Sequence, residues 1–208
     1  MTRDADSTHE LRVLFICTGN MYRSPLAERL LASRLPGVRV SSAGTRAWAG
    51  VGGARGSGMD TATLAVLESL GGDGTGFRST LLAPELIISA DLVLGLAREH
   101  RDEAVRMHPA ALRRSFTLKE FLRLADGTWE PGRTPRELIR CAAAERGTPH
   151  PAPAADDEIA DPQGRGHEVL TRCAQEIGTA VAALAALLAP GAAGEPCEFP
   201  ISQPRQGG

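Results

Sequence analysis

The sequence predicts an α/β fold: a three-layer open parallel sheet of about four strands flanked by helices. The first observation is that short apolar runs alternate along the chain with segments whose apolar residues have helical spacing. The second is that the first elements run strand, helix, strand, an order that implies parallel pairing and a right-handed crossover. The third is a hydrophobic content of 42%, which is ample for a globular core.

Each element follows from its local pattern. Apolar runs predict strands at residues 11–16, 38–42, 91–96 and 115–118. Helical spacing or charge pattern predicts helices at residues 26–35, 59–70, 84–89, 98–107, 135–146 and within 163–189, with another that ends at residue 124. Proline suits the first helical position, so Pro25 is expected to begin the first helix.

Composition narrows the class of protein. A net charge of −2 gives no reason to expect nucleic acid or an anionic membrane as a partner. The segment 180–189 is the most hydrophobic, yet it is much shorter than the roughly 20 residues that cross a bilayer. The cysteines at positions 17, 141, 173 and 197 have neither a disulfide nor a zinc spacing, and the five histidines form no ligand cluster. We therefore expect a cytoplasmic protein without metal or cofactor.

One short stretch carries the chemistry. The first apolar run ends at Cys17, and a loop then leads into a helix. Loop amides and the positive end of a helix cradle anions, and the same field favours a cysteine thiolate. Arg23 can bind a phosphate through two parallel N–H bonds, Ser24 can donate to the thiolate, and Asn20 tolerates a left-handed backbone. The expected phosphate-binding loop is Thr18, Gly19, Asn20, Met21, Tyr22, Arg23 and Ser24.

The string Cys17-x-Gly19-Asn20-x-x-Arg23-Ser24-Pro25 after a strand resembles the signature of the low-molecular-weight protein tyrosine phosphatases. The resemblance implies a protein tyrosine phosphatase that hydrolyses phosphotyrosine and other aryl phosphate monoesters. In that mechanism the Cys17 thiolate attacks phosphorus and forms a phosphocysteine, which water then hydrolyses. The implied substrate is a phosphotyrosine protein or a small aryl phosphate, and the implied setting is a bacterial tyrosine kinase system.

The resemblance also assigns more distant residues. Asp161 is followed by proline and directly precedes the last helix, as in the family's acid loop, so Asp161 is the expected general acid. Asp161 as a helix cap or turn residue is the alternative. Ser42 ends the second strand within a Ser-Ala-x-Thr stretch, and it is expected to join Asn20 and Ser24 in supporting the phosphate loop; an ordinary strand-end serine is the alternative. No site role is carried onto residues 76–80.

The sequence departs from the family at the edges of the site. Tyr22 stands where many members have a second cysteine that can protect the nucleophile as a disulfide, so that redox switch is expected to be absent. Gln163 stands where the family has an aromatic wall of the substrate slot, while Trp48 is expected to supply the opposite wall unless it only packs its own loop. One missing wall weakens selection for aryl groups, because a stacked aromatic pair contributes about 0.5–1.5 kcal/mol.

The resemblance further organises the chain. A single phosphatase domain is expected over residues 11–189, between a flexible N-terminus at 1–10 and a disordered tail at 190–208. Residues 126–157 are interpreted as an insertion, because the resemblance implies that common family members reach the acid loop with fewer residues. Within it, Thr134-Pro135-Arg136-Glu137 is a capping-box pattern that predicts a helix, and a proline- and alanine-rich tether follows. The inserted helix is either a plain surface helix or one that limits substrate size at the mouth of the site.

Two other functions fit the same motif. An arsenate reductase on this fold would pass oxidation from Cys17 to resolving cysteines, but Cys141, Cys173 and Cys197 include no close pair. A non-catalytic phosphate-binding module would keep the loop and lose the chemistry. The joint presence of Cys17, Arg23 and Asp161 favours a catalyst over that module.

Overall fold

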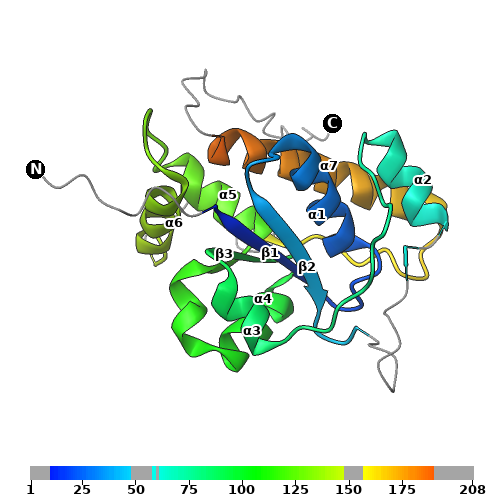
Figure 1. The fold of residues 1–208 in the computed structure, drawn as a ribbon, viewed down its shortest axis with the longest axis horizontal. Helices are drawn as coiled ribbons and strands as arrows, with labels where there is room; N and C mark the ends of the chain where they lie inside the picture. Colours follow the sequence, from blue (N-terminus) through cyan, green and yellow to red (C-terminus); the bar gives the residue numbers. More distant parts are fainter. Residues whose placement is uncertain (1–9, 48–57, 60, 148–156, 190–208) are drawn as a thin grey trace, which may run out of the picture.

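The computed structural model describes residues 10–47, 58–59, 61–147 and 157–189. Its centre is one sheet with the strand order β2-β1-β3-β4 (Figure 1). The strands are β1 (Arg12–Cys17), β2 (Arg39–Gly44), β3 (Leu92–Gly95) and β4 (Ser115–Thr117), and every pair is parallel. The predicted fold class is confirmed. Trp48, the N-terminal residues 1–9 and the tail 190–208 lie outside the described residues.

Strand β1 is buried on both faces, which explains its continuous apolar run. Val13 and Phe15 alternate with Leu14 and Ile16, and the two pairs enter two separate hydrophobic clusters. This period of two divides the core into a layer on each side of the sheet. Cys17 follows the same alternation at the strand's carboxyl end.

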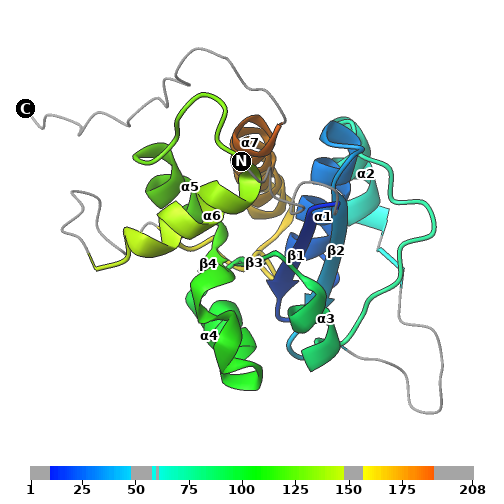
Figure 2. The same cartoon turned by 60° about the vertical axis from the view of Figure 1, so that its left-hand side comes forward.

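The helices form the outer layers (Figures 1 and 2). Helix α1 (Arg23–Arg34) packs between the sheet and α7 (His167–Leu188), and α2 (Thr61–Ser69) contacts both helices. On the other face lie α3 (Pro84–Ser89), α4 (Arg98–Met107) and the 3₁₀ helix η2 (Pro109–Arg114). Helix α5 (Leu118–Asp126) packs against α7 on the first face.

Helix boundaries differ from prediction in informative places. Helix α1 begins at Arg23, so the expectation that Pro25 takes its first position is wrong. The amide of Leu26 donates to the carbonyl of Tyr22 at 3.0 Å, which closes the first helical turn inside the phosphate loop. Pro25 fits because it still lies in the first turn, where amides have no intrahelical acceptor. The 3₁₀ turn of η2 was not predicted.

Helix α6 (Pro135–Ala144) begins where its capping box predicts. The Thr134 hydroxyl accepts from the amide of Glu137, while the Glu137 carboxylate accepts from the amide of Thr134 at 2.8 Å. Its apolar face packs against α5 and η2. No described residue of α6 lines the pocket that contains Cys17, which favours the plain surface helix. The interpretation of this segment as an insertion stays a prediction.

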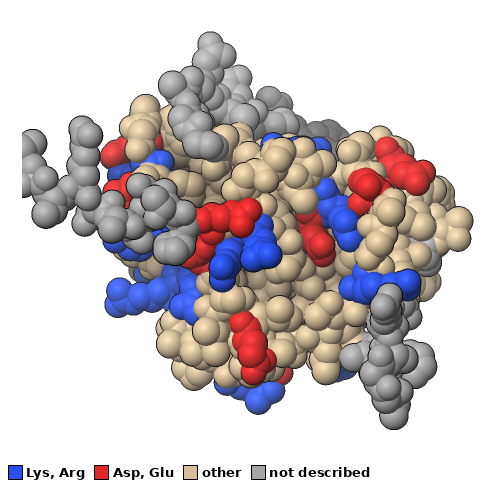
Figure 3. Space-filling view, viewed as in Figure 1, with Lys and Arg blue, Asp and Glu red and all other residues tan. Residues whose placement is uncertain are grey.

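The charged surface residues on the face shown do not form a patch of one sign (Figure 3). On the face shown in Figure 3, acidic and basic side chains lie next to one another. Within the described ranges, no helix is both long and apolar enough to pass through a bilayer.

Candidate active site

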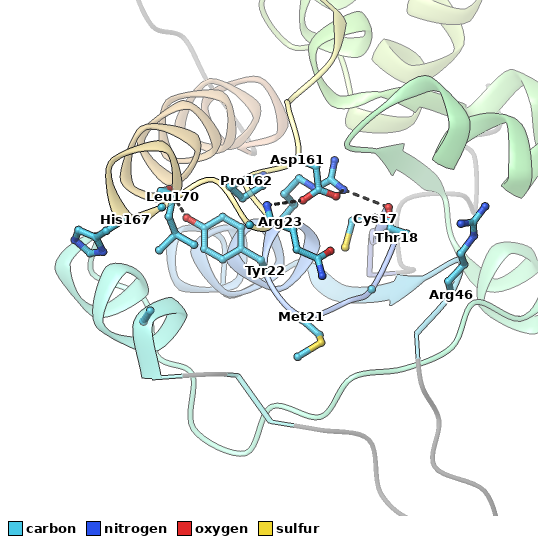
Figure 4. A pocket seen from close by; sticks show the side chains of 15 residues that line it. Cys17, Thr18, Met21, Tyr22, Arg23, Arg46, Asp161, Pro162, His167 and Leu170 are labelled. Atoms are coloured by element: carbon cyan, nitrogen blue, oxygen red, sulfur yellow. Dashed lines mark hydrogen bonds and ion pairs between the residues drawn. The ribbon is translucent and has the colours of Figure 1, made fainter.

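The carboxyl end of β1 positions the site. This strand lies between β2 and β3, so the chain leaves it in one direction and returns on its other side. Open α/β sheets bind ligands at such a switch point. A pocket of about 630 Å³ opens there, and Cys17 and Arg23 lie in it with Asp161, which is 138 residues beyond Arg23 (Figure 4).

The Cys17 sulfur receives two hydrogen bonds within its own loop. The amide of Asn20 donates to Sγ at 3.2 Å, and the hydroxyl of Ser24 donates at 3.0 Å. The residue is only 3% exposed. Both donors thus point at the sulfur from a buried loop at a helix N-terminus, an arrangement that suits an anion-binding site.

The side chain of Asn20 holds the loop together from beneath. Asn20 is fully buried and has the one positive φ of any described non-glycine residue, 51°. Its Nδ2 donates to the hydroxyls of Ser24 at 3.0 Å and Ser42 at 2.8 Å, while its Oδ1 accepts from the amide of Thr80 at 2.7 Å. The structure thus brings Asn20, Ser24 and Ser42 together. It also places Thr80 beside the loop, where no site role was expected.

Glu28 completes this network, and sequence reasoning missed it. The Ser42 hydroxyl donates to the Glu28 carboxylate at 2.5 Å. Burial raises the pKa of Glu28, and the hydrogen bond from Ser42 partly opposes that shift. Glu28 follows Ser24 by four residues on α1, so both side chains share one helix face. That spacing was the available signal.

Gly44 allows the loop to approach β2 closely. A Cβ at this position would lie 2.7 Å from the carbonyl oxygen of Thr18 and 2.8 Å from the amide of Asn20. Both are backbone atoms, so neither can turn aside. Only glycine therefore fits between the end of β2 and the phosphate loop in this arrangement.

Arg23 is 4% exposed and bonded on several sides. Its guanidinium donates to the carbonyl of Ile159 and to the hydroxyl of Thr18, each at 3.2 Å, and it forms an ion pair with Asp161. The planar fork is therefore fixed at the rim of the loop, with its charge turned toward the pocket (Figure 4). Ile159, which sequence reasoning also missed, acts here through its backbone alone.

Asp161 is more exposed than Arg23. Its side chain is 44% exposed, and its Oδ1 accepts from the amide of Gln163 at 3.1 Å. Gly164 and Gly166, with φ of 74° and 81°, carry the chain from here into α7. The carboxylate thus reaches the pocket from a turn that glycine conformations shape.

The far side of the pocket is lined by Met21, Tyr22, Pro162, Gln163 and Leu170, among others. The Tyr22 hydroxyl donates to the carbonyl of Leu170 in the first turns of α7. An aromatic ring from the phosphate loop therefore lies near Pro162 and Leu170 in this pocket, which Gln163 also lines (Figure 4). Sequence reasoning placed Tyr22 in the phosphate loop and noted the lost thiol, but it gave the tyrosine ring no role in the pocket.

Cys173 is a poor redox partner for Cys17. Cys17, Cys141 and Cys173 are all free thiols. Cys173 contacts the acid loop through the carbonyl of Ala160 at 3.5 Å, and burial raises its pKa to about 12. It therefore stays a protonated thiol, which is a weak nucleophile toward an oxidised partner.

The fold and the loop together define a class of protein. Residues 12–130 match the family described as low molecular weight phosphotyrosine protein phosphatase. The chain belongs to this family, whose members are phosphatases and hence hydrolytic enzymes.

Individual relatives differ in the substrate that their names give. A protein-arginine-phosphatase of Geobacillus stearothermophilus is 40% identical over 136 residues, 64% of this chain and 87% of its own. A probable low molecular weight protein-tyrosine-phosphatase EpsP of Ralstonia nicotianae is 35% identical over 109 residues, 52% of this chain and 71% of its own. The solved YwlE arginine phosphatase from Geobacillus stearothermophilus has a TM-score of 0.61 at 34% identity, covering 84% of this chain and 90% of that one.

Proposed function

We propose that the protein hydrolyses phosphotyrosine, and aryl phosphate monoesters in general, through a phosphocysteine on Cys17. The observation that carries the proposal is the joint placement of Cys17, Arg23 and Asp161 in one pocket. Arg23 would bind the phosphate oxygens while the thiolate attacks phosphorus. The loop amides and the start of α1 would stabilise the charge that builds on those oxygens.

Asp161 is the proposed general acid. Its carboxylate lies on the rim of the pocket, within contact of the phosphate-binding arginine. When a phosphate dianion engages Arg23, the ion pair with Asp161 is weakened and the carboxyl group can hold a proton. It would then protonate the departing phenolate and afterwards activate the water that attacks the phosphocysteine.

The described pocket favours an aryl over a guanidinium leaving group. Its lining includes Met21, the ring of Tyr22 and Leu170, which suit an aromatic ring. Arg23 and Arg46 are positive, and the single carboxylate among its lining residues, Asp161, is already paired with Arg23. A phosphoarginine side chain would find no free carboxylate among these residues.

Phosphoarginine is nevertheless the second candidate substrate. The observation that favours it is the 40% identity to a protein-arginine-phosphatase over 87% of that protein. The two candidates share the same loop chemistry and differ only in the leaving group.

We also propose a cytoplasmic setting, since a catalytic thiolate needs reducing conditions. The proposed counterpart is a bacterial tyrosine kinase.

Turnover of three substrates by three proteins tests the proposal. Wild type should hydrolyse a phosphotyrosine peptide and p-nitrophenyl phosphate faster than a phosphoarginine peptide. Cys17→Ser should be inactive on all of them. Asp161→Asn should lose about 10²–10⁴-fold on the phosphotyrosine peptide and less on p-nitrophenyl phosphate, whose leaving group needs little protonation.

Each outcome separates the alternatives. Faster turnover of phosphoarginine would replace the proposed substrate with the second candidate. Phosphate binding without turnover of any ester would indicate a binding module. Residual turnover by Cys17→Ser would show that Cys17 is not the nucleophile. Arsenate-dependent oxidation of Cys17 that thioredoxin reverses would restore the reductase reading.

A further inference from the structure

His100 lies directly behind the phosphate loop and takes no part in the mechanism above. It sits in the first turn of α4 and is only 1% exposed. Its Nδ1 accepts from the amide of Ala97 at 3.0 Å, and its Nε2 lies 3.0 Å from the Thr18 hydroxyl oxygen. The ring therefore joins the start of α4 to Thr18, the first residue of the phosphate loop.

The first of these bonds decides which nitrogen carries the proton. A backbone amide can only donate, so Nδ1 must be the acceptor and the hydrogen of the neutral ring is on Nε2. Burial, with the positive charge of Arg23, lowers the pKa of His100 to about 4, so the ring is neutral near pH 7. Nε2–H consequently has two acceptors within reach, the Thr18 hydroxyl at 3.0 Å and the exposed Glu99 carboxylate at 3.4 Å, and the nearer of them is Thr18.

The Thr18 hydroxyl is then oriented by its neighbours. Its oxygen accepts from Nε2–H of His100 and from the guanidinium of Arg23, at 3.0 and 3.2 Å. Both lone pairs are occupied, so the one remaining function of this hydroxyl is to donate its hydrogen. Thr18 lines the same pocket as Cys17 and Arg23, and Figure 4 shows it beside them. A phosphate held by Arg23 offers an acceptor there.

We propose that His100 is a positioning residue that fixes the Thr18 hydroxyl as a hydrogen-bond donor to an oxygen of the bound phosphate. The inference rests on the proposed function only in requiring that phosphate bind in the loop, and the leaving group plays no part in it. Any phosphate ester, or inorganic phosphate itself, would meet the same donor. His100 touches no substrate and acts through Thr18 alone.

Two pairs of substitutions in the full chain separate positioning from mere support. His100→Asn keeps an acceptor near the place of Nδ1 but loses the donor to Thr18, whereas His100→Gln keeps a donor near the place of Nε2. Thr18→Val removes the hydroxyl, whereas Thr18→Ser retains it. Calorimetric titration with inorganic phosphate measures binding, p-nitrophenyl phosphate measures turnover, and thermal melting shows that each variant is folded.

His100→Asn and Thr18→Val should each weaken phosphate binding by about two- to tenfold, the range for one hydrogen bond. His100→Gln and Thr18→Ser should stay within about twofold of wild type. The double variant of His100→Asn and Thr18→Val should bind no worse than Thr18→Val alone, because both act through one hydroxyl. A merely structural histidine would not produce this coupling.

The proposal is overturned if Thr18→Val binds phosphate like wild type, if His100→Gln loses as much as His100→Asn, or if the two losses multiply in the double variant. Should His100→Asn fail to fold, the Thr18 pair still decides whether the hydroxyl binds phosphate. If wild type failed to hydrolyse aryl esters while the His100 and Thr18 variants still showed coupled losses of phosphate binding, the proposed function would be wrong and this inference would stand.

Discussion

The phosphate loop and the acid loop meet in one pocket but are built differently. The phosphate loop is buried, and Asn20, Ser24 and Ser42 bond its parts to one another and to Cys17. The acid loop reaches the same pocket through Asp161, whose side chain is 44% exposed, and continues through glycines with positive φ. A buried, hydrogen-bonded loop thus faces a more exposed segment that carries the proposed general acid.

This difference suits the two tasks. The phosphate passes through every step of a phosphocysteine mechanism, so its donors gain from fixed positions. The proposed general acid, Asp161, would have to donate a proton, accept another and exchange its ion pair with Arg23 within one catalytic cycle. Substitutions in the first region should therefore damage binding and rate together, while substitutions in the second should tune the rate for particular leaving groups.

Removing the side chain of Asn20 should break the phosphate loop most severely. Asn20→Ala loses three hydrogen bonds and puts alanine at a φ of 51°, so kcat/KM should fall about 100-fold, the cost of misplacing reacting groups by about 1 Å. Asn20→Gly is the matched control, because glycine adopts this φ freely. If Asn20→Gly were as active as wild type, the side-chain bonds would be unnecessary.

Gly44→Ala should have the next largest effect. Its Cβ would meet backbone atoms of Thr18 and Asn20 at 2.7 and 2.8 Å, so we expect a loss of about 1–3 kcal/mol in the free energy of unfolding and about tenfold in phosphate affinity. Gly37→Ala, with no atom within 4 Å of its added Cβ, is the control. Chemical denaturation and phosphate titration measure the two quantities, and equal behaviour of both variants would refute the close approach.

Acid should weaken the support of the phosphate loop through His100. The pKa of its folded form is about 4, below the ordinary value of 6.5, so between these pH values the unfolded chain binds a proton that the folded protein does not. The free energy of unfolding should therefore fall by up to about 1.4 kcal/mol per pH unit as pH drops from 6.5 toward 4. His100→Gln should lack this component, while Arg23, Asp161 and Glu99 beside the ring are common to both proteins. Parallel pH profiles would contradict the assignment.

An aromatic residue added to the acid loop should have the smallest effect and the opposite sign. Gln163→Tyr would add a second aromatic ring to the pocket that Tyr22 lines and should raise kcat/KM for aryl phosphates about two- to tenfold. Gln163→Leu controls for added apolar surface without a ring. An equal gain on a phosphoarginine peptide would mean that stacking on an aryl group is not the cause.

The sequence identified the phosphate loop well because that loop is local. Cys17, Asn20, Arg23 and Ser24 lie within eight positions, so one motif contains the proposed nucleophile, the proposed phosphate donor and their support. The capping box at Thr134 located the start of α6 for the same reason. Asp161 required the resemblance to a family, since nothing in its own segment points toward Cys17.

The residues that were missed depend on tertiary placement. His100 and Thr80 approach the loop only because α4 follows β3 and the segment after α2 runs past β2. Ile159 contributes a carbonyl, which any residue type would provide. The Tyr22 hydroxyl donates to the carbonyl of Leu170 in α7, and this contact holds the tyrosine ring at the pocket. The two residues are 148 positions apart, so no local pattern specifies the contact.

The ion pair between Arg23 and Asp161 also bears on the release of inorganic phosphate, the product of the proposed reaction. The Asp161 carboxylate can form its ion pair with the Arg23 guanidinium again when inorganic phosphate dissociates. Such internal competition for Arg23 would lower the affinity for inorganic phosphate, so accumulated product would inhibit only weakly.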